Sequence, residues 1–175
     1  MTETASFREE PLPAGAGADA PGDAGTPETA TGAVPIFRGV RRALAARGFA
    51  SLTEFRLACG RRADLLAMDG NGTVIIVEVK SGVPDFRSDQ KWPEYRDWCD
   101  AFYFAVDEAF PLDLIPEECG LMVADAFGAE VLREPAVSRL APARRKSLLL
   151  RAAMTGAGRL HRIDDPLFSH SQATV

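Results

Sequence analysis

Three charged residues, Asp64, Glu78 and Lys80, have the types and the spacing needed to hydrolyse phosphodiester bonds with a divalent cation. Glu78 and Lys80 end a run of mostly β-branched apolar residues, which is typical of a strand buried on both faces. Side chains alternate along a strand, so Glu78 and Lys80 point to one face and Val79 to the other. Ionisable groups at the end of a buried strand are costly unless they meet a partner, a metal ion or a substrate.

Two carboxylates aimed at one point are a suitable ligand set for Mg²⁺ or Mn²⁺. Asp64 and Glu78 would bind the ion, and the backbone carbonyl of Val79 would complete the coordination. The ion would activate a water molecule and offset charge on the scissile phosphate. Lys80 would orient that water or stabilise the transition state as a point charge. The alternative interpretation is a simple Glu78–Lys80 salt bridge at a strand end.

Asp64 reaches Glu78 only if the hairpin that carries them has the right register. The turn lies at residues 69–72, with the sequence Asp-Gly-Asn-Gly. A two- or four-residue loop would place Asp64 opposite Val77, on the wrong face, whereas a three-residue or bulged loop places it opposite Glu78. The two glycines supply the positive φ that a bulge requires, so we predict the bulged register.

The segment at 52–57 is predicted as an edge strand beside this hairpin. Residues 51–54 would also fit a helix capping box, but the apolar positions and the turn at Cys59 and Gly60 favour a strand. On a strand, Glu54 would face the site. The alternative is that Glu54 is a surface acid.

The remaining segments complete an α/β fold. A loop is predicted after Lys80 because of Gly82 and Pro84, and a helix begins between residues 89 and 93. Pro142 opens a basic helix in which residues 148, 149 and 152 pack inward. Besides these, we predict a helix from residue 35 to 47 and strands at 61–68, 73–79, 101–106, 120–125 and 129–132. The predicted order is α-β-β-β-α-β-β-β-α, a mixed β-sheet flanked by helices.

Length and composition indicate one globular domain with an acidic tail. The chain has 175 residues, 46% hydrophobic and 26% charged, and a net charge of −5. Residues 1–33 contain six acidic residues and one basic residue, so the rest of the chain is balanced and a nucleic-acid partner is not excluded. We predict a disordered tail at 1–33, a core at 34–135, a basic helical segment packed on the core at 136–164, and a frayed tail at 165–175.

The sequence also indicates a cytoplasmic protein that does not enter membranes. It has neither a secretory signal nor an apolar run long enough to span a bilayer. The three cysteines, Cys59, Cys99 and Cys119, are odd in number and lack metal-ligand spacing, so we expect neither a disulfide framework nor a structural zinc.

Basic residues, several of them in the C-terminal helix, predict a surface for sequence-independent contacts with phosphates. The bases of that helix are expected to face outward. The residues that we expect to contact DNA are Arg62, Arg87, Arg144, Arg145, Lys146 and Arg151.

The pattern of Asp64 on one strand and Glu78-Val79-Lys80 on the next resembles the PD-(D/E)XK, or restriction-endonuclease-like, nucleases. A longer pattern, over roughly residues 36–135, resembles the bacterial MmcB family of DNA repair proteins. It comprises Arg62-x-Asp64, Val77-Glu78-Val79-Lys80-Ser81, Asp85-Phe86-Arg87-x-Asp89-x-Lys91-Trp92-x-x-Tyr95 and Cys99-Asp100-x-Phe102-Tyr103-Phe104-Ala105-Val106.

The resemblance implies a restriction-endonuclease-like core, with Asp64 and Glu78 as metal ligands and Lys80 as the catalytic lysine. Ala63 stands where the superfamily motif has proline. Gln90 and Tyr95 are similar to the Gln-x-x-x-Tyr of RecB-like nucleases, but their spacing is one residue longer.

Further residues of the pattern are expected around the site. Asp85 would hold Lys80 or a second metal ion, and Lys91 would meet phosphate. Trp92 and Tyr95 would either stack on an unpaired base or pack in the core. The second-tier site residues are therefore Glu54, Ser81, Asp85, Asp89, Lys91, Trp92 and Tyr95.

We therefore expect a DNA repair endonuclease that uses Mg²⁺ or Mn²⁺ and acts on damaged, gapped or single-stranded DNA, with the protein associated with the nucleoid when it is bound. The alternative is a catalytically silent module of the same fold that binds DNA and recruits protein partners in repair. The two hypotheses differ in whether the Asp64, Glu78 and Lys80 set is needed for function.

Overall fold

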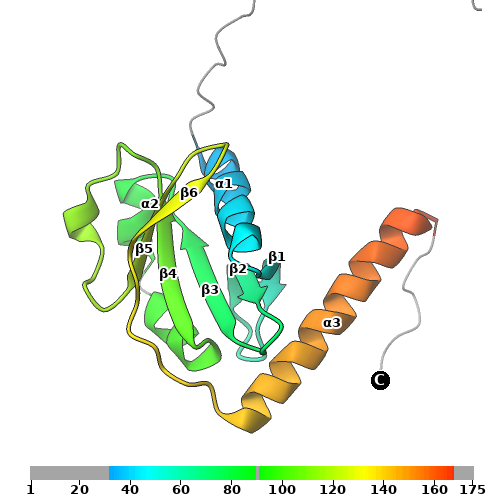
Figure 1. Ribbon diagram of the computed structural model, residues 1–175. Helices are drawn as coiled ribbons and strands as arrows, with labels where there is room; N and C mark the ends of the chain where they lie inside the picture. The colour runs from blue at the N-terminus through cyan, green and yellow to red at the C-terminus, as the bar shows by residue number, and fades with distance from the viewer. Residues whose placement is uncertain (1–31, 90, 168–175) are drawn as a thin grey trace, which may run out of the picture.

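In the computed structural model, which describes residues 32–89 and 91–167, six strands form one mixed sheet in the order β1-β2-β3-β4-β5-β6 (Figure 1). The pairs β1–β2, β2–β3 and β5–β6 are antiparallel, whereas β3–β4 and β4–β5 are parallel. The strands are β1 (Ala50–Arg56), β2 (Arg62–Met68), β3 (Val74–Val79), β4 (Ala101–Val106), β5 (Gly120–Ala124) and β6 (Ala129–Arg133). The predicted mixed sheet flanked by helices is confirmed.

Helices cover both faces of this sheet (Figure 1). On one face, α1 buries the apolar side chains that recur at i, i+4 and i+8, namely Ile36, Val40 and Leu44. The helices are α1 (Ala33–Ala46), α2 (Val83–Ser88), the 3₁₀ helices η1 (Trp92–Trp98) and η2 (Leu112–Leu114), and α3 (Pro142–Asp164). Within the described residues, none of these helices has the length and apolarity to cross a membrane.

The segment after Lys80 corrects one prediction. We expected a loop because of Gly82 and Pro84, but α2 occupies Val83–Ser88. Pro84 lies in the first turn, where a helical residue has no intrahelical partner for its N–H, and so it does not interrupt the helix. The expected helix that follows is the 3₁₀ helix η1, which begins at Trp92.

The β2–β3 hairpin has the predicted register. Leu65 pairs with Val77 and Met68 with Val74. The N–H of Asp69 donates to the carbonyl of Thr73, so the loop itself is residues 70–72. Gly72 has φ of 79°, the left-handed conformation that closes a three-residue loop with a bulge.

The core is densest around the two central strands, β3 and β4, in which every side chain is buried. Side chains alternate between the two faces of the sheet. Val77 and Tyr103 pack against α1. Ile76 and Phe104 lie on the opposite face, where η1 and α3 pack. In the first half of α3, Leu148 and Ala152 are buried and Leu149 is half-buried, which agrees with the predicted inward side. The second half of α3 runs along the edge strand β1, where Arg159 donates to the carbonyl of Thr53.

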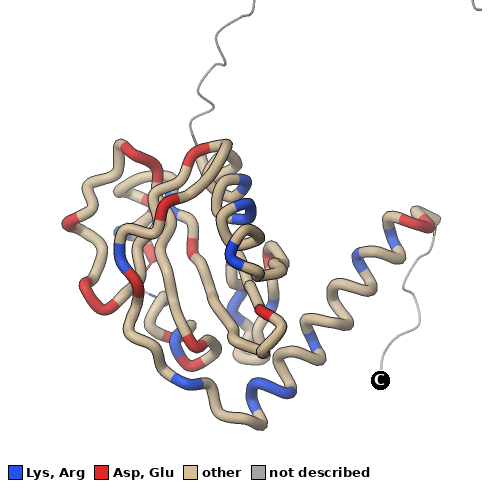
Figure 2. Tube along the Cα trace, in the orientation of Figure 1, with Lys and Arg blue, Asp and Glu red and all other residues tan. Residues whose placement is uncertain are grey.

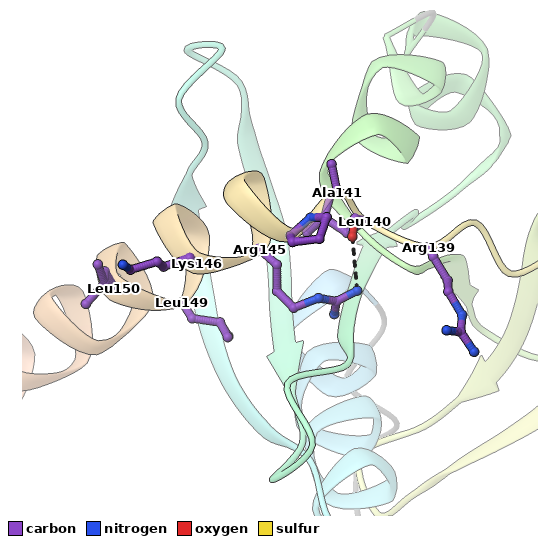
Figure 3. Close-up of a pocket in the computed structure, with 8 residues that line it drawn as sticks. Arg139, Leu140, Ala141, Arg145, Lys146, Leu149 and Leu150 are labelled. Atoms are coloured by element: carbon purple, nitrogen blue, oxygen red, sulfur yellow. Dashed lines mark hydrogen bonds between the residues drawn. The ribbon is translucent and has the colours of Figure 1, made fainter.

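Arg145 departs from the expectation that the bases of α3 face outward. Its guanidinium donates two hydrogen bonds of 2.7 Å to the buried carboxylate of Asp100. It also donates to the carbonyls of Gly72 and Leu140, and Figure 3 shows the bond to Leu140. Arg145 therefore ties α3 to the β2–β3 turn and to the start of β4.

The predicted tails lie mostly outside the described residues. This holds for 1–31 of the acidic tail and for 168–175 of the C-terminal one. The basic helix that was predicted to begin at Pro142 does so and ends at Asp164.

Candidate active site

The carboxylates of Asp64 and Glu78 lie together where β2 and β3 separate. The ladder ends at Leu65 and Val77, so the next residues, Asp64 and Glu78, are opposite each other. The N–H of Asp64 donates to Oε1 of Glu78 at 3.1 Å, and the N–H of Val79 donates to Oδ2 of Asp64 at 2.9 Å. Carboxylate oxygens thus replace the backbone carbonyls that would continue the ladder, and they fix the two side chains between the strands.

Both carboxylates are in an environment that disfavours their charge. Glu78 is only 4% exposed and Asp64 is half-buried. Burial, and next the negative charge of Asp64, raise the pKa of Glu78 to about 8. Burial also raises the pKa of Asp64, against the opposing effects of the Val79 N–H and Lys80. A cation at this point would relieve both penalties, because it would stabilise the ionised forms.

Lys80 is held at the same site by two acids. Its ammonium, on a side chain that is 5% exposed, lies 2.5 Å from Oδ2 of Asp89 and 4.0 Å from Oε2 of Glu78. Burial alone would raise the pKa of Asp89, but the hydrogen bond from Lys80 outweighs this and lowers it. The ammonium therefore lies between the loop that follows α2 and the end of β3.

Asp85 does not hold Lys80, which corrects one of the expected roles. Its Oδ2 accepts hydrogen bonds from the N–H and the hydroxyl of Ser81 instead. Because residues 83–88 form a helix, Asp85 lies in its first turn and turns back toward Ser81. Asp89 lies just beyond the end of that helix and reaches Lys80.

The donor chemistry of this site fits a hard divalent cation. The two backbone hydrogen bonds use one oxygen of each carboxylate, Oδ2 of Asp64 and Oε1 of Glu78, and the second oxygen of each would face the ion. Within the described parts of the chain, no three His, Cys, Asp or Glu side chains are arranged to hold a metal on their own. Mg²⁺ keeps several waters and takes only one or two carboxylates from a protein, which is the number that Asp64 and Glu78 could supply.

Glu54 lies in line with the two carboxylates. The β1–β2 register places it opposite Asp64, and its φ of 50° interrupts the ladder there. Its carboxylate forms a salt bridge of 2.6 Å with Arg62, and both side chains are about half exposed. The negative charge of Glu54 contributes to the raised pKa of Asp64, so it lies close enough to influence the site.

The two aromatic residues of the expected site pack inside the protein. The rings of Trp92 and Tyr95 both stack on Phe102, at centroid distances of 5.9 and 6.0 Å. The Tyr95 hydroxyl donates to the carbonyl of Arg62. Of the two interpretations offered by the sequence, the structure shows core packing. Lys91 is exposed beside them.

The remaining basic residues proposed for DNA contact differ in their surroundings. Arg144 lies over the ring of Trp98, with its guanidinium carbon 4.9 Å from the ring centre, and donates to the carbonyl of Asp97. Arg151 donates to the carbonyl of Arg56 on the edge strand β1. Lys146 and Arg87 are exposed. Since Arg145 is bound to Asp100, we exclude it from the surface offered to DNA.

A pocket of about 780 Å³ lies at the start of α3, away from the carboxylates. Leu140, Pro142, Leu149 and Leu150 contribute to its lining (Figure 3 labels the leucines). None of the residues expected at the catalytic site lines it, although Lys146, which we expect to contact DNA, does.

Sequence reasoning missed the role of Asp100, which appears there only as part of the longer family pattern. It is 5% exposed and accepts hydrogen bonds from Val74, Leu140 and Arg145. An acidic residue directly before an entirely apolar strand was the available signal, because such a residue needs partners once it is buried.

Comparison with known proteins adds two findings. A family model described as DNA repair protein MmcB-like matches residues 17–167. A solved structure, of a protein of unknown function from Silicibacter pomeroyi, is similar with a TM-score of 0.77 and 41% sequence identity, over 80% of this chain and 97% of that one. A search of curated proteins found no significant match.

Proposed function

This chain belongs to the MmcB-like DNA repair protein family, and we propose that its part in repair is that of a metal-dependent DNA endonuclease of the PD-(D/E)XK type. Its substrate would be damaged, gapped or single-stranded DNA, and its ion Mg²⁺ or Mn²⁺. The observation that supports this most strongly is the pair of carboxylates that the hairpin register brings together beside a buried lysine.

Each residue of the site has a part that follows from its position. Asp64 and Glu78 would bind the ion through the carboxylate oxygens that do not accept backbone hydrogen bonds. The carbonyl of Val79 would be a further ligand. The ion supplies Lewis acidity toward the phosphate and lowers the pKa of a bound water. Asp64 and Glu78 must be deprotonated to bind it, and their raised pKa values make this step dependent on pH.

Lys80 would donate to a phosphate oxygen or to the attacking water. Its ammonium is already near Glu78, and Asp89 fixes its direction. A buried ammonium interacts more strongly with developing negative charge than an exposed one does, because less water screens it. Asp89 is thus a positioning residue in this proposal.

Exposed basic residues would contact the DNA backbone. Arg62, Arg87, Lys91, Lys146 and the two arginines Arg144 and Arg151 remain in this proposal. Figure 2 shows basic positions along α3 as well as on α1. If these residues contact phosphates, the affinity for DNA falls steeply as salt is added.

The test is cleavage of labelled single-stranded, gapped, abasic and duplex DNA with Mg²⁺ or Mn²⁺. Asp64→Asn retains an oxygen that can accept the Val79 N–H, and Lys80→Met retains the length of the buried side chain, so both variants should fold. We expect each to reduce cleavage by about 10³-fold or more, because several kcal/mol of transition-state stabilisation are lost. Asp97→Asn, on the exposed side of η1, is the matched control and should cut as the wild type does.

The opposite result would point to the alternative function. If the wild type cuts none of these substrates with either ion but still binds DNA, and Asp64→Asn binds equally well, the chain is a non-catalytic module that recruits other repair proteins. The tight Lys80–Asp89 pair is compatible with that outcome, since it already neutralises the lysine.

A further inference from the structure

A second surface suited to nucleic acid lies on the other face of the sheet from the carboxylates. A groove of about 560 Å³ runs between α1 and the edge strand β1. Alternation along β3 shows that the groove and the carboxylates are on opposite faces of the sheet. Val77 packs with α1, whereas Ile76, which lies on the same face as Glu78, packs in the cluster on the opposite side of the sheet. The groove is lined by Val34, Phe37, Arg38, Arg41, Arg42, Ala45, Phe49, Ser51 and Thr53.

The arginines of α1 and of its C-cap divide into two kinds. Arg42 donates to the carbonyls of Ala126 and Phe127, and Arg47 forms a salt bridge with Glu134, so these two hold the helix against the β5–β6 hairpin. Arg38 and Arg41 line the groove, are exposed, and form no ion pair with any described residue. Figure 2 shows this basic stretch along α1. Like charges three residues apart repel each other on a helix, and an anionic ligand would remove that cost.

The rest of the lining suits unpaired bases. Phe37 and Phe49 are half-buried, so each is supported by the core while part of it stays accessible in the groove. Ser51 and Thr53 add hydroxyl groups from β1. Aromatic faces beside cations are the usual means of binding single strands without sequence preference, whereas a duplex hides its base faces. We propose that this groove binds a single-stranded segment of nucleic acid.

This proposal rests on the proposed function, since it gives the nuclease a path for its substrate. Thr53, at the end of the groove, is followed by Glu54, which lies opposite Asp64. In the plane of the sheet, the α-carbons of Thr53 and Asp64 are separated by one strand spacing and one residue rise, about 6 Å. The single strand would pass around the edge of β1 to reach the carboxylates.

Cations line that passage. Arg159 of α3 donates to the carbonyls of Thr53 and Glu54, and Arg151 to the carbonyl of Arg56. Arg62 lies across from them on β2, in its salt bridge with Glu54. The edge of β1 therefore carries positive charge from the groove to the site, which a backbone of phosphates would follow.

The experiment measures binding of the full chain to a fluorescent 12-nucleotide oligo(dT) by anisotropy, with a chelator present so that nothing is cut. We expect Arg38→Glu/Arg41→Glu to weaken binding about tenfold or more, and to reduce the salt slope by roughly one to two, as the loss of two phosphate contacts requires. Phe37→Leu, which keeps an apolar side chain against the sheet, should weaken binding about fivefold or more by removing a stacking surface.

The matched control is Arg139→Glu/Arg162→Glu, which makes the same charge change at two exposed arginines outside the groove. The control should weaken oligo(dT) binding less than Arg38→Glu/Arg41→Glu does. With a 12-base-pair duplex, the difference in affinity between the control and the groove variant should be smaller. Equal loss in both variants would overturn the proposal, as would unchanged oligo(dT) binding by Arg38→Glu/Arg41→Glu.

Binding of a peptide of residues 1–31 is measured in parallel. If Arg38→Glu/Arg41→Glu weakens binding of that peptide but not of oligo(dT), the groove binds the chain's own acidic segment and not DNA. Cleavage is assayed separately, so a groove that binds and a site that does not cut can be told apart.

Discussion

Carboxylates lie beside both ends of β3, and the two groups are in opposite situations. At its start, Asp100 accepts hydrogen bonds from Val74, from Leu140 and twice from Arg145. Burial would raise the pKa of Asp100, but these donors outweigh it and lower the pKa. At its end, Asp64 and Glu78 share two backbone donors, and the ammonium of Lys80 lies 4.0 Å from Glu78 but closer to Asp89. The pKa values of Asp64 and Glu78 are raised.

The difference indicates which cluster is structural and which is available for chemistry. Asp100 has a full set of donors and a cation that is bound to it on both oxygens, so a ligand could add nothing there. The positive charge around Asp64 and Glu78 is too small to neutralise the two carboxylates, and a divalent cation would supply the rest of it. Removal of a charge should therefore weaken the protein at one end of β3 and strengthen it at the other.

The largest effect is expected at Asp100. Asp100→Ala leaves the partly buried Arg145 and two backbone N–H groups without their acceptor, and it should lower the free energy of unfolding by about 3–5 kcal/mol. Urea denaturation followed by circular dichroism measures this. Asp97→Ala removes an exposed acid three residues away and should change stability by less than about 0.5 kcal/mol. A similar small effect at Asp100 would show that its hydrogen bonds do not hold α3 in place.

The pH dependence of stability should have opposite signs for the two clusters. The pKa of Glu78 is raised from an ordinary 4.5 to about 8, so between these values the folded state keeps a proton that the unfolded state has lost. The metal-free protein should then lose on the order of 2 kcal/mol as the pH rises from about 5 to 8. The pKa of Asp100 is lowered, so its contribution is present above the ordinary 3.8 and is lost as the pH falls below that value.

Denaturation of the metal-free wild type across this pH range measures both changes in the free energy of unfolding. Glu78→Gln should reduce the loss of stability between pH 5 and 8, and Asp100→Asn should reduce the loss of stability at acidic pH. Stability that rises steadily from pH 5 to 8 would contradict the raised pKa of Glu78.

At a fixed pH of about 8, Glu78→Gln should raise stability by about 1–2 kcal/mol, because it removes a buried like charge while the amide oxygen can still accept the Asp64 N–H. The same variant should no longer cut DNA. Glu54→Gln is the control, since its side chain is about half exposed and its salt bridge to Arg62 is worth little. Destabilisation by Glu78→Gln would mean that the ionised glutamate is needed for folding.

The smallest effect is that of the ion itself in the absence of DNA. With 10 mM Mg²⁺ and a dissociation constant of about 1 mM, binding to the folded state should add about 1.4 kcal/mol. Thermal unfolding of the wild type, with and without Mg²⁺, gives this shift, and it should be absent in Asp64→Asn. An equal shift in both proteins would indicate a general effect of salt on stability.

Local patterns in the sequence were enough to predict how the strands around Asp64 and Glu78 pair. The odd loop at residues 70–72 decides the register, and alternation along β3 then decides which side chains share a face. The strand that carries Glu54 and the final hairpin were also predicted, because their apolar alternation is short-range information. The helix α2 was missed because Pro84 reads as a breaker unless its place in the first turn is known.

Partners that come from distant segments were not predictable in this way. Arg145 reads as one more base on an outward face, but it meets Asp100, 45 residues earlier in the chain. Lys80 has two acidic residues within reach in the sequence, and only the helical path of residues 83–88 selects Asp89 over Asp85. Arg38 and Arg42 look equivalent until the β5–β6 turn is placed against one of them.

The sequence by itself determined which charged residues lie together at the end of β3, since residue types, alternation and loop length are local properties of the chain. The tertiary structure alone decided the electrostatic state of each carboxylate. That state depends on how many donors approach a buried oxygen, and those donors come from Leu140 and Arg145 at one end of β3 and from Val79, Lys80 and the backbone of Asp64 at the other.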